Sequence, residues 1–93
     1  MRIRYTRRAA ADLDSVLTYI AERSPEGADR VGARLQAVLA LLAEHPRIGR
    51  LTGKRDIRRI VVYPYPYLVF YRATDTEVII HSVRHAARRP RGA

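Results

Sequence analysis

Arg84 and His85, followed by Arg88 and Arg89, are the residues of this 93-residue chain whose types and spacing could do chemistry. An imidazole titrates near neutrality, so one placed among guanidinium groups could move a proton while the cations hold a phosphate. Cleavage of RNA could use that combination, because it needs a proton shuttle beside stabilised negative charge. The same cluster would serve equally well to bind a phosphate or a carboxylate without any reaction.

The other two histidines have simpler interpretations. His45 precedes Pro46 at the end of a predicted helix, where an imidazole can meet the negative end of the helix dipole. His81 falls within a predicted strand, where a packed or hydrogen-bonded side chain is the expected role.

Several kinds of catalytic or metal site are excluded by the sequence. It has no glycine-rich phosphate loop, no His-Glu-x-x-His pair and no Gly-x-Ser-x-Gly turn. It has no cysteine, which excludes disulfides, thiolate zinc sites and a cysteine nucleophile. We therefore expect neither a metal ion nor a cofactor.

Positive charge is concentrated in the second half of the chain. The sequence has 18 lysines and arginines against 9 acidic residues, and Lys54 is the single lysine. Residues 1–46 carry 7 basic and 6 acidic residues, whereas residues 47–93 carry 11 basic and 3 acidic ones. Such a field attracts polyanions, so nucleic acid or an acidic protein segment is the expected partner.

Hydropathy predicts a cytoplasmic protein with no membrane association. Residues 1–5 lack the apolar core of a signal peptide, and no apolar run approaches the roughly 18 residues of a membrane span.

Two amphipathic helices are predicted after a short strand in which Ile3 and Tyr5 alternate with Arg2 and Arg4. Apolar residues recur every three or four positions over residues 7–23 and again over residues 25–44. Thr6 and Ser24 are suited to cap the two helices. Helices joined by so short a turn form an antiparallel αα-hairpin.

The second half predicts a loop and then a three-stranded antiparallel β-meander packed on the hairpin. Residues 47–56 contain two glycines and four positive charges, as is typical of a loop. The three strands of the meander are expected at residues 57–63, 67–73 and 77–84, because these segments are rich in valine, isoleucine and aromatic residues. Residues 85–93 form a basic tail. The whole chain, 1–93, is predicted to be one domain of the α+β class.

Both faces of the meander are expected to be apolar. In the middle strand Leu68 and Phe70 face away from Tyr71, and in the last strand Val83 is expected on the same face as Ile79. One helical hairpin can cover only one of these faces. Either the sheet curls around its second face or another chain covers it.

Three short motifs occur in a characteristic order. Residues 46–50 are Pro-Arg-Ile-Gly-Arg, residues 66–72 are Pro-Tyr-Leu-Val-Phe-Tyr-Arg, and residues 83–88 are Val-Arg-His-Ala-Ala-Arg. With the predicted strand, hairpin and meander around them, the chain resembles the RelE/ParE toxins of type II toxin–antitoxin systems over nearly its full length. The resemblance implies their fold and a small acidic antitoxin as partner. That antitoxin is expected to lie across the hairpin and the sheet.

The resemblance leaves two activities open. ParE-like toxins poison DNA gyrase, whereas RelE-like toxins cut messenger RNA in the ribosomal A site with several basic residues and often a C-terminal tyrosine. Arg59 matches one basic position of the nuclease pattern, but Leu68 and Val61 stand where that pattern has basic residues. Residues 88–93 also lack an aromatic side chain. The ParE-like interpretation is therefore favoured, with gyrase as the target and a ParD-like antitoxin.

Under the nuclease alternative, Arg84, His85 and Arg59 would be the catalytic residues. Under either activity, we expect basic residues of the loop, the first meander strand and the C-terminus to bind the target or the antitoxin. These are Arg50, Lys54, Arg55, Arg58, Arg59, Arg84, His85, Arg88 and Arg89. The basic residues of segment 54–59 are expected beside one edge of the sheet, near Arg84 and the tail.

A non-toxic nucleic-acid-binding module is a further alternative. Tyr63, Tyr65 and Tyr67 flank Arg58 and Arg59 in the sequence, and exposed aromatic side chains beside cations are typical of surfaces that bind single strands.

Overall fold

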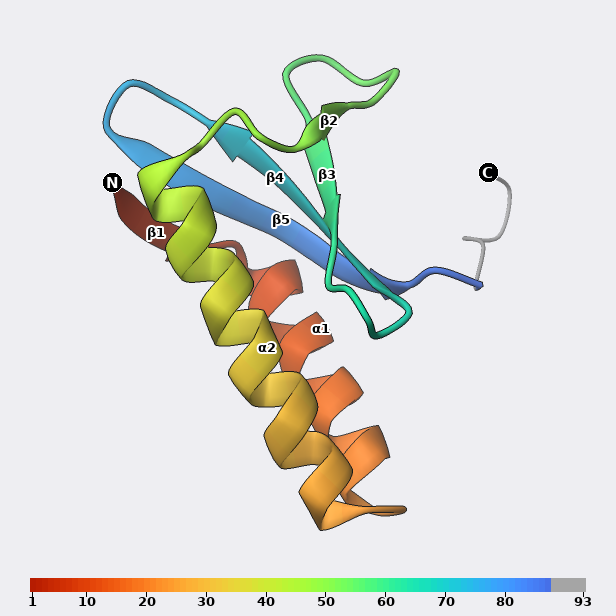
Figure 1. Ribbon diagram of the computed structural model, residues 1–93. Helices are drawn as coiled ribbons and strands as arrows, with labels where there is room; N and C mark the ends of the chain where they lie inside the picture. The colour runs from red at the N-terminus through yellow and green to blue at the C-terminus, as the bar shows by residue number, and fades with distance from the viewer. Residues whose placement is uncertain (88–93) are drawn as a thin grey trace.

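The computed structural model describes residues 1–87 as two layers, a helical hairpin and a five-stranded sheet (Figure 1). In chain order the elements are β1 (Arg2–Tyr5), α1 (Arg7–Ala21), α2 (Pro25–Glu44), β2 (Arg50–Leu51), β3 (Arg58–Val61), β4 (Tyr67–Ala73) and β5 (Glu77–His85). The strand order is β1-β5-β4-β3-β2. β1 pairs with β5 in parallel, and the other neighbouring strands pair antiparallel. The predicted α+β class is confirmed.

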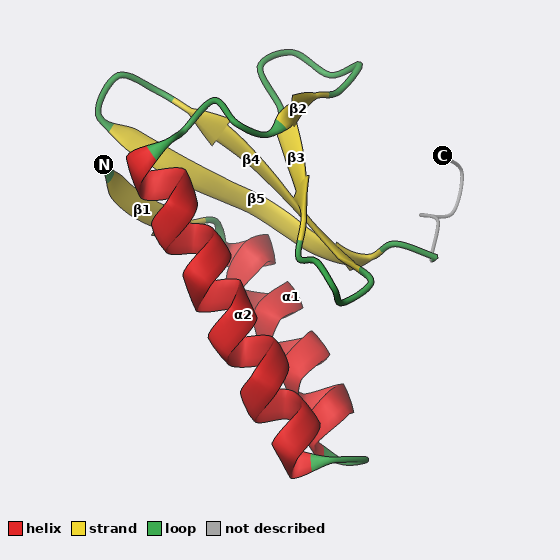
Figure 2. Cartoon of the chain, in the orientation of Figure 1, coloured by secondary structure: helices red, strands yellow, loops and turns green. Residues whose placement is uncertain are grey.

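Both helices lie on one side of the sheet, and the tip of the hairpin extends well beyond it (Figure 2). The core between the layers is apolar. Leu35, Val38 and Leu42 from α2 are buried in one cluster with sheet residues that include Tyr71 and Ile80. No helix of residues 1–87 covers the opposite side of the sheet.

Both helices begin at the predicted caps. The Thr6 hydroxyl accepts a hydrogen bond from the Ala9 N–H, and the Ser24 hydroxyl accepts one from the Gly27 N–H, each at 3.0 Å. Such caps satisfy N–H groups that have no partner inside the helix. α1 ends at Ala21, two residues before the predicted end. The chain must leave the helix there because Ser24 adopts the extended backbone of a cap.

Residues 50 and 51, predicted to be loop, form the short edge strand β2, which pairs with β3. The loop after β2 is closed by the Thr52 N–H and hydroxyl, which both donate to the Ile57 carbonyl at 2.9 Å. Two residues between glycine-rich and charged neighbours carry no periodicity, so the sequence pattern could not indicate this strand.

β3 is shorter than predicted and β5 is longer. β3 ends at Val61, because the chain then turns back with the Val62 N–H donating to the Tyr67 carbonyl. β5 continues through His85, which the sequence analysis placed in the tail. The physical reason is that His85 still has a partner across the sheet, Tyr67.

The predicted orientation of Val83 was wrong because β5 contains a β-bulge. Tyr71 pairs with Ile80 and Phe70 pairs with Ser82, so His81 is an extra residue between them. An extra residue reverses the facing of every later side chain in a strand. Val83 is consequently buried in the core on the helix side instead of lying on the opposite face.

Candidate functional site

The face of the sheet turned away from the helices carries most of the arginines of the strands. Its members follow from the strand register, because paired residues of neighbouring strands share a face. We call this the open face. It comprises Arg2, Arg4, Arg50, Arg59, Val61, Leu68, Phe70, Arg72, Glu77, Ile79, Ser82 and Arg84.

Phe70 lies at the centre of the open-face arginines. Arg59 is its register partner on β3, and Arg50 is the partner of Arg59 on β2. The Arg84 guanidinium carbon lies over the Phe70 ring, 5.2 Å from its centroid, in a cation–π contact. The Arg84 Nε is buried and has no hydrogen-bond acceptor among residues 1–87. Of the predicted site residues, Arg84 contacts the Phe70 ring and Arg59 lies beside Phe70 on the neighbouring strand.

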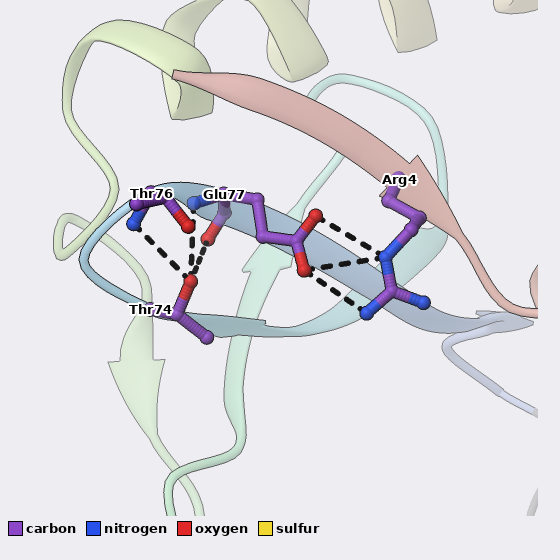
Figure 3. A network of polar contacts seen from close by, with 4 residues as sticks. All are labelled: Arg4, Thr74, Thr76 and Glu77. Atoms are coloured by element: carbon purple, nitrogen blue, oxygen red, sulfur yellow. Dashed lines mark hydrogen bonds and ion pairs between the residues drawn. The ribbon is translucent and has the colours of Figure 1, made fainter.

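Glu77 is the only acidic side chain in the described strands, and it is already paired. The Arg4 Nη2 donates to its Oε1 at 3.0 Å and the Arg4 Nε donates to its Oε2 at 3.2 Å (Figure 3). The hydrogen bond from Arg4 lowers the pKa of Glu77, and the same bond raises the pKa of Arg4. Thr74 holds the start of this strand, since its hydroxyl accepts from the N–H groups of Thr76 and Glu77.

His85 lies on the face opposite Arg84. It is the register partner of Tyr67, and the two rings meet edge to face with centroids 5.3 Å apart. Its Nδ1 accepts a hydrogen bond from the Ala87 N–H at 3.1 Å. Adjacent in sequence, Arg84 and His85 thus project to different sides of the sheet, so the structure does not assemble them into one site.

His81, the bulge residue, is the histidine with an unusual environment. Its Nε2 is buried without a hydrogen-bond partner among residues 1–87. Burial lowers the pKa of His81, and the positive charge of Arg72 lowers it further. No sequence pattern indicated this environment, because the alternation of apolar residues does not show where a bulge will form.

Arg58 serves the loop before β2 and faces the helix side. Its Nη1 donates to the carbonyls of Arg47 at 3.1 Å and Gly49 at 2.8 Å. The Gly49 N–H in turn donates to the hydroxyl of Tyr71, a fully buried residue, at 2.8 Å. Burial raises the pKa of that hydroxyl, while the Gly49 N–H and the nearby charge of Arg58 act in the opposite direction. Arg58 and Arg59, neighbours in sequence, therefore have different surroundings.

The remaining predicted site residues are spread out. Lys54 and Arg55 are exposed in the loop between β2 and β3, at the sheet edge farthest from β1. Arg84 lies two strands away from β3, on β5. Arg88 and Arg89 lie outside the described residues.

The helical hairpin carries an apolar groove that the sequence analysis did not find. Its volume is about 690 Å³, and its lining includes Leu13, Leu17, Ala28, Gly32, Leu35 and Leu39. Small residues on α2 leave this groove between the helices. The pattern of apolar residues showed two buried stripes, but it could not show how incompletely they cover each other.

Two absences concern the described part of the chain. Within residues 1–87 no three histidine or acidic side chains come close enough to hold a metal ion. In the same residues no helix has both the length and the apolar character needed to cross a membrane.

Structural comparison identifies the fold. The toxin–antitoxin complex RelBE of E. coli matches with a TM-score of 0.67 and 23% identity over 94% of this chain and 98% of the matched chain. The chromosomal ParDE system of P. aeruginosa matches with a TM-score of 0.67 and 20% identity over 91% and 95% of the two chains. The fold is therefore that of the RelE/ParE superfamily.

Sequence comparison then identifies the family. The model described as "ParE toxin of type II toxin-antitoxin system, parDE" matches residues 3–90. Toxin RelE2 of Caulobacter vibrioides is 43% identical over 84 residues, which are 90% of this chain and 93% of that protein. The chain belongs to the ParE toxin family of type II toxin–antitoxin systems, and the resemblance found in the sequence is confirmed.

Proposed function

We propose that this toxin inhibits DNA gyrase by binding it through the open face, without cleaving RNA. The observation that supports this is the separation of Arg84 from His85 by the sheet. A nuclease needs a proton-transferring group beside the cations that hold the scissile phosphate. An inhibitor that traps its target needs only a complementary surface.

The other groups near the open face give no better source of protons. Glu77 is held as a carboxylate by Arg4. The Nε2 of His81 is buried, so it cannot reach a substrate without a rearrangement of the bulge. Among residues 1–87, the surroundings of these groups favour a binding role.

The charge of the open face fits an anionic surface on the target. Arg50 and Arg59 face each other across β2 and β3, and like charges directly opposite each other destabilise a sheet. Arg72 is exposed on the same face. Carboxylates or phosphates of a partner would relieve this repulsion and accept charge-assisted hydrogen bonds.

The proposal includes a small acidic antitoxin, ParD-like, that neutralises the toxin in the cytoplasm. The matched structures are those of the RelBE toxin–antitoxin complex and of a ParDE system. In this chain an amphipathic antitoxin segment would find an apolar groove on the hairpin and arginines on the open face. Electrostatic steering would make its association faster at low salt than at high salt.

A RelE-like messenger RNA endonuclease is the second candidate. It is favoured by Arg84 over the Phe70 ring and by Arg59 as the register partner of Phe70, since cations beside an aromatic ring can hold a nucleotide. Toxin RelE2, the relative above, carries the name of that branch.

Purified toxin assayed against both targets separates these candidates. We expect it to block supercoiling by purified gyrase and to leave ribosome-bound messenger RNA intact. Codon-specific cleavage of that message, with gyrase unaffected, would contradict the proposal and support the nuclease.

A further inference from the structure

The β-bulge in β5 decides which side chain of that strand reaches the open face. If β5 ran on without an extra residue after Ile80, Val83 would pair with Leu68 and Arg84 with Tyr67. Arg84 would then point toward the helices and Val83 toward solvent. The bulge at His81 instead pairs Arg84 with Leu68 on the open face.

Thr6, which caps α1, and Asp12, within α1, hold the bulge in place. The Thr6 N–H donates to the Ile80 carbonyl at 3.0 Å, and the Thr6 hydroxyl donates to the His81 carbonyl at 2.9 Å. Successive carbonyls of a regular strand point to opposite neighbours, so two in a row that point to Thr6 mark the bulge. The Val83 N–H, turned the same way, donates to the Asp12 Oδ2 at 3.0 Å.

Asp12 lies within α1, and its side chain supplies the acceptor for the Val83 N–H. Its carboxylate is partly buried, and its other contact is Arg8, with the Arg8 Nε 3.8 Å from the Oδ2. Without an acceptor at this point, the Val83 N–H would be left unpaired beside the core, which favours the regular register over the bulged one.

We propose that Asp12 is a positioning residue for Arg84. It acts through the backbone of β5, by holding the bulge that turns the Arg84 guanidinium to the open face. This inference rests on the proposed function only in taking Arg84 as a group that contacts the target. The positioning itself is a statement about the register of β4 and β5.

The register test uses NMR on the purified chain. In the unaltered protein, interstrand nuclear Overhauser contacts should pair Phe70 with Ser82, and the Val83 amide proton should shift as carboxylates are protonated in acid. Asp12→Asn keeps an oxygen acceptor, so it should keep the pairing and abolish that shift. Asp12→Ala should replace the pairing by contacts between Phe70 and His81. Asp14→Ala, which removes an exposed carboxylate from the same helix, should change neither signal.

Target inhibition is then measured for the same variants with and without Arg84→Ala. In the unaltered and Asp12→Asn backgrounds, Arg84→Ala should weaken inhibition by about tenfold or more, as expected for loss of a charge-assisted hydrogen bond. In the Asp12→Ala background it should have less than about a twofold effect, because Arg84 has already left the open face.

Different results would contradict the positioning role of Asp12 and the proposed target surface. A bulged register and a full Arg84 effect in Asp12→Ala would overturn the positioning role. An acid shift of the Val83 amide proton that persists in Asp12→Asn would also overturn the positioning role. This measurement does not require Asp12→Ala to fold. A changed register with inhibition that never depends on Arg84 would support the positioning role and contradict the proposed target surface.

Discussion

The two faces of the sheet use the same residue type in opposite ways. On the helix side, the Arg58 guanidinium donates hydrogen bonds to two backbone carbonyls of its own chain. On the open face, Arg84 rests on an aromatic ring and its Nε has no acceptor among residues 1–87. An arginine with its hydrogen bonds satisfied stabilises the fold, whereas one without acceptors is available to a partner. The arginines of the strands thus fall into two structural groups, and the register of the strands decides to which group each belongs.

The largest change in the free energy of unfolding is expected at Gly49, on the helix side of the sheet. A Cβ placed on Gly49 would collide with the hydroxyl of Tyr71, which is fully buried and cannot move away. Gly49→Ala should therefore lower the free energy of unfolding by about 2–3 kcal/mol, as overpacking and loss of the hydrogen bond add. Urea denaturation measures this effect.

Gly53→Ala is the matched control, since a Cβ at Gly53 meets no atom within 4 Å. We expect its free energy of unfolding to stay within about 0.5 kcal/mol of the unaltered chain. Equal losses for the two glycine variants would show that the packing of Gly49 against Tyr71 is not what holds the loop.

An intermediate effect distinguishes arginines of the two faces. Arg58→Ala leaves two carbonyls without their donor and should lower the free energy of unfolding by about 1–2 kcal/mol. Arg72→Ala, on the open face, should change it by less than about 0.5 kcal/mol. Thermal and urea unfolding of both variants checks the comparison, and a larger loss for Arg72→Ala would invert it.

The smallest effect is a pH dependence from His81. Its pKa is lowered in the folded state, first by burial and then by Arg72, so the unfolded chain binds a proton more readily. The stabilising contribution is present above the pKa of the unfolded imidazole, about 6.5, and is lost as the pH falls through the folded value. His81→Gln should flatten the fall in stability below about pH 6.5 relative to the unaltered chain. A His81→Gln profile identical to the original would refute the assignment.

The sequence predicted what depends on local pattern. The caps at Thr6 and Ser24 and the α+β order followed from residue type and periodicity. The resemblance to the RelE/ParE toxins also came from short motifs, such as the loop around Gly49. These signals lie within a few residues of one another, so they need no knowledge of tertiary contacts.

What depends on long-range contacts was missed. The bulge at His81 is held by Thr6 and Asp12, which are about 70 positions away, so no local pattern announces it. One inserted residue then turns Arg84, and not its neighbour His85, to the open face. The role of Arg58 was missed for the same reason. Its acceptors lie in the loop before β2, whose conformation no sequence pattern predicts.

Inhibition of gyrase by variants of the two adjacent residues Arg84 and His85 tests the central claim most directly. The purified toxin and His85→Ala should inhibit supercoiling to the same extent within about twofold, because His85 lies on the other face. Arg84→Ala should be weaker by about tenfold or more while unfolding at the same urea concentration. Equal loss of inhibition in both variants, or inhibition abolished by His85→Ala alone, would contradict the account.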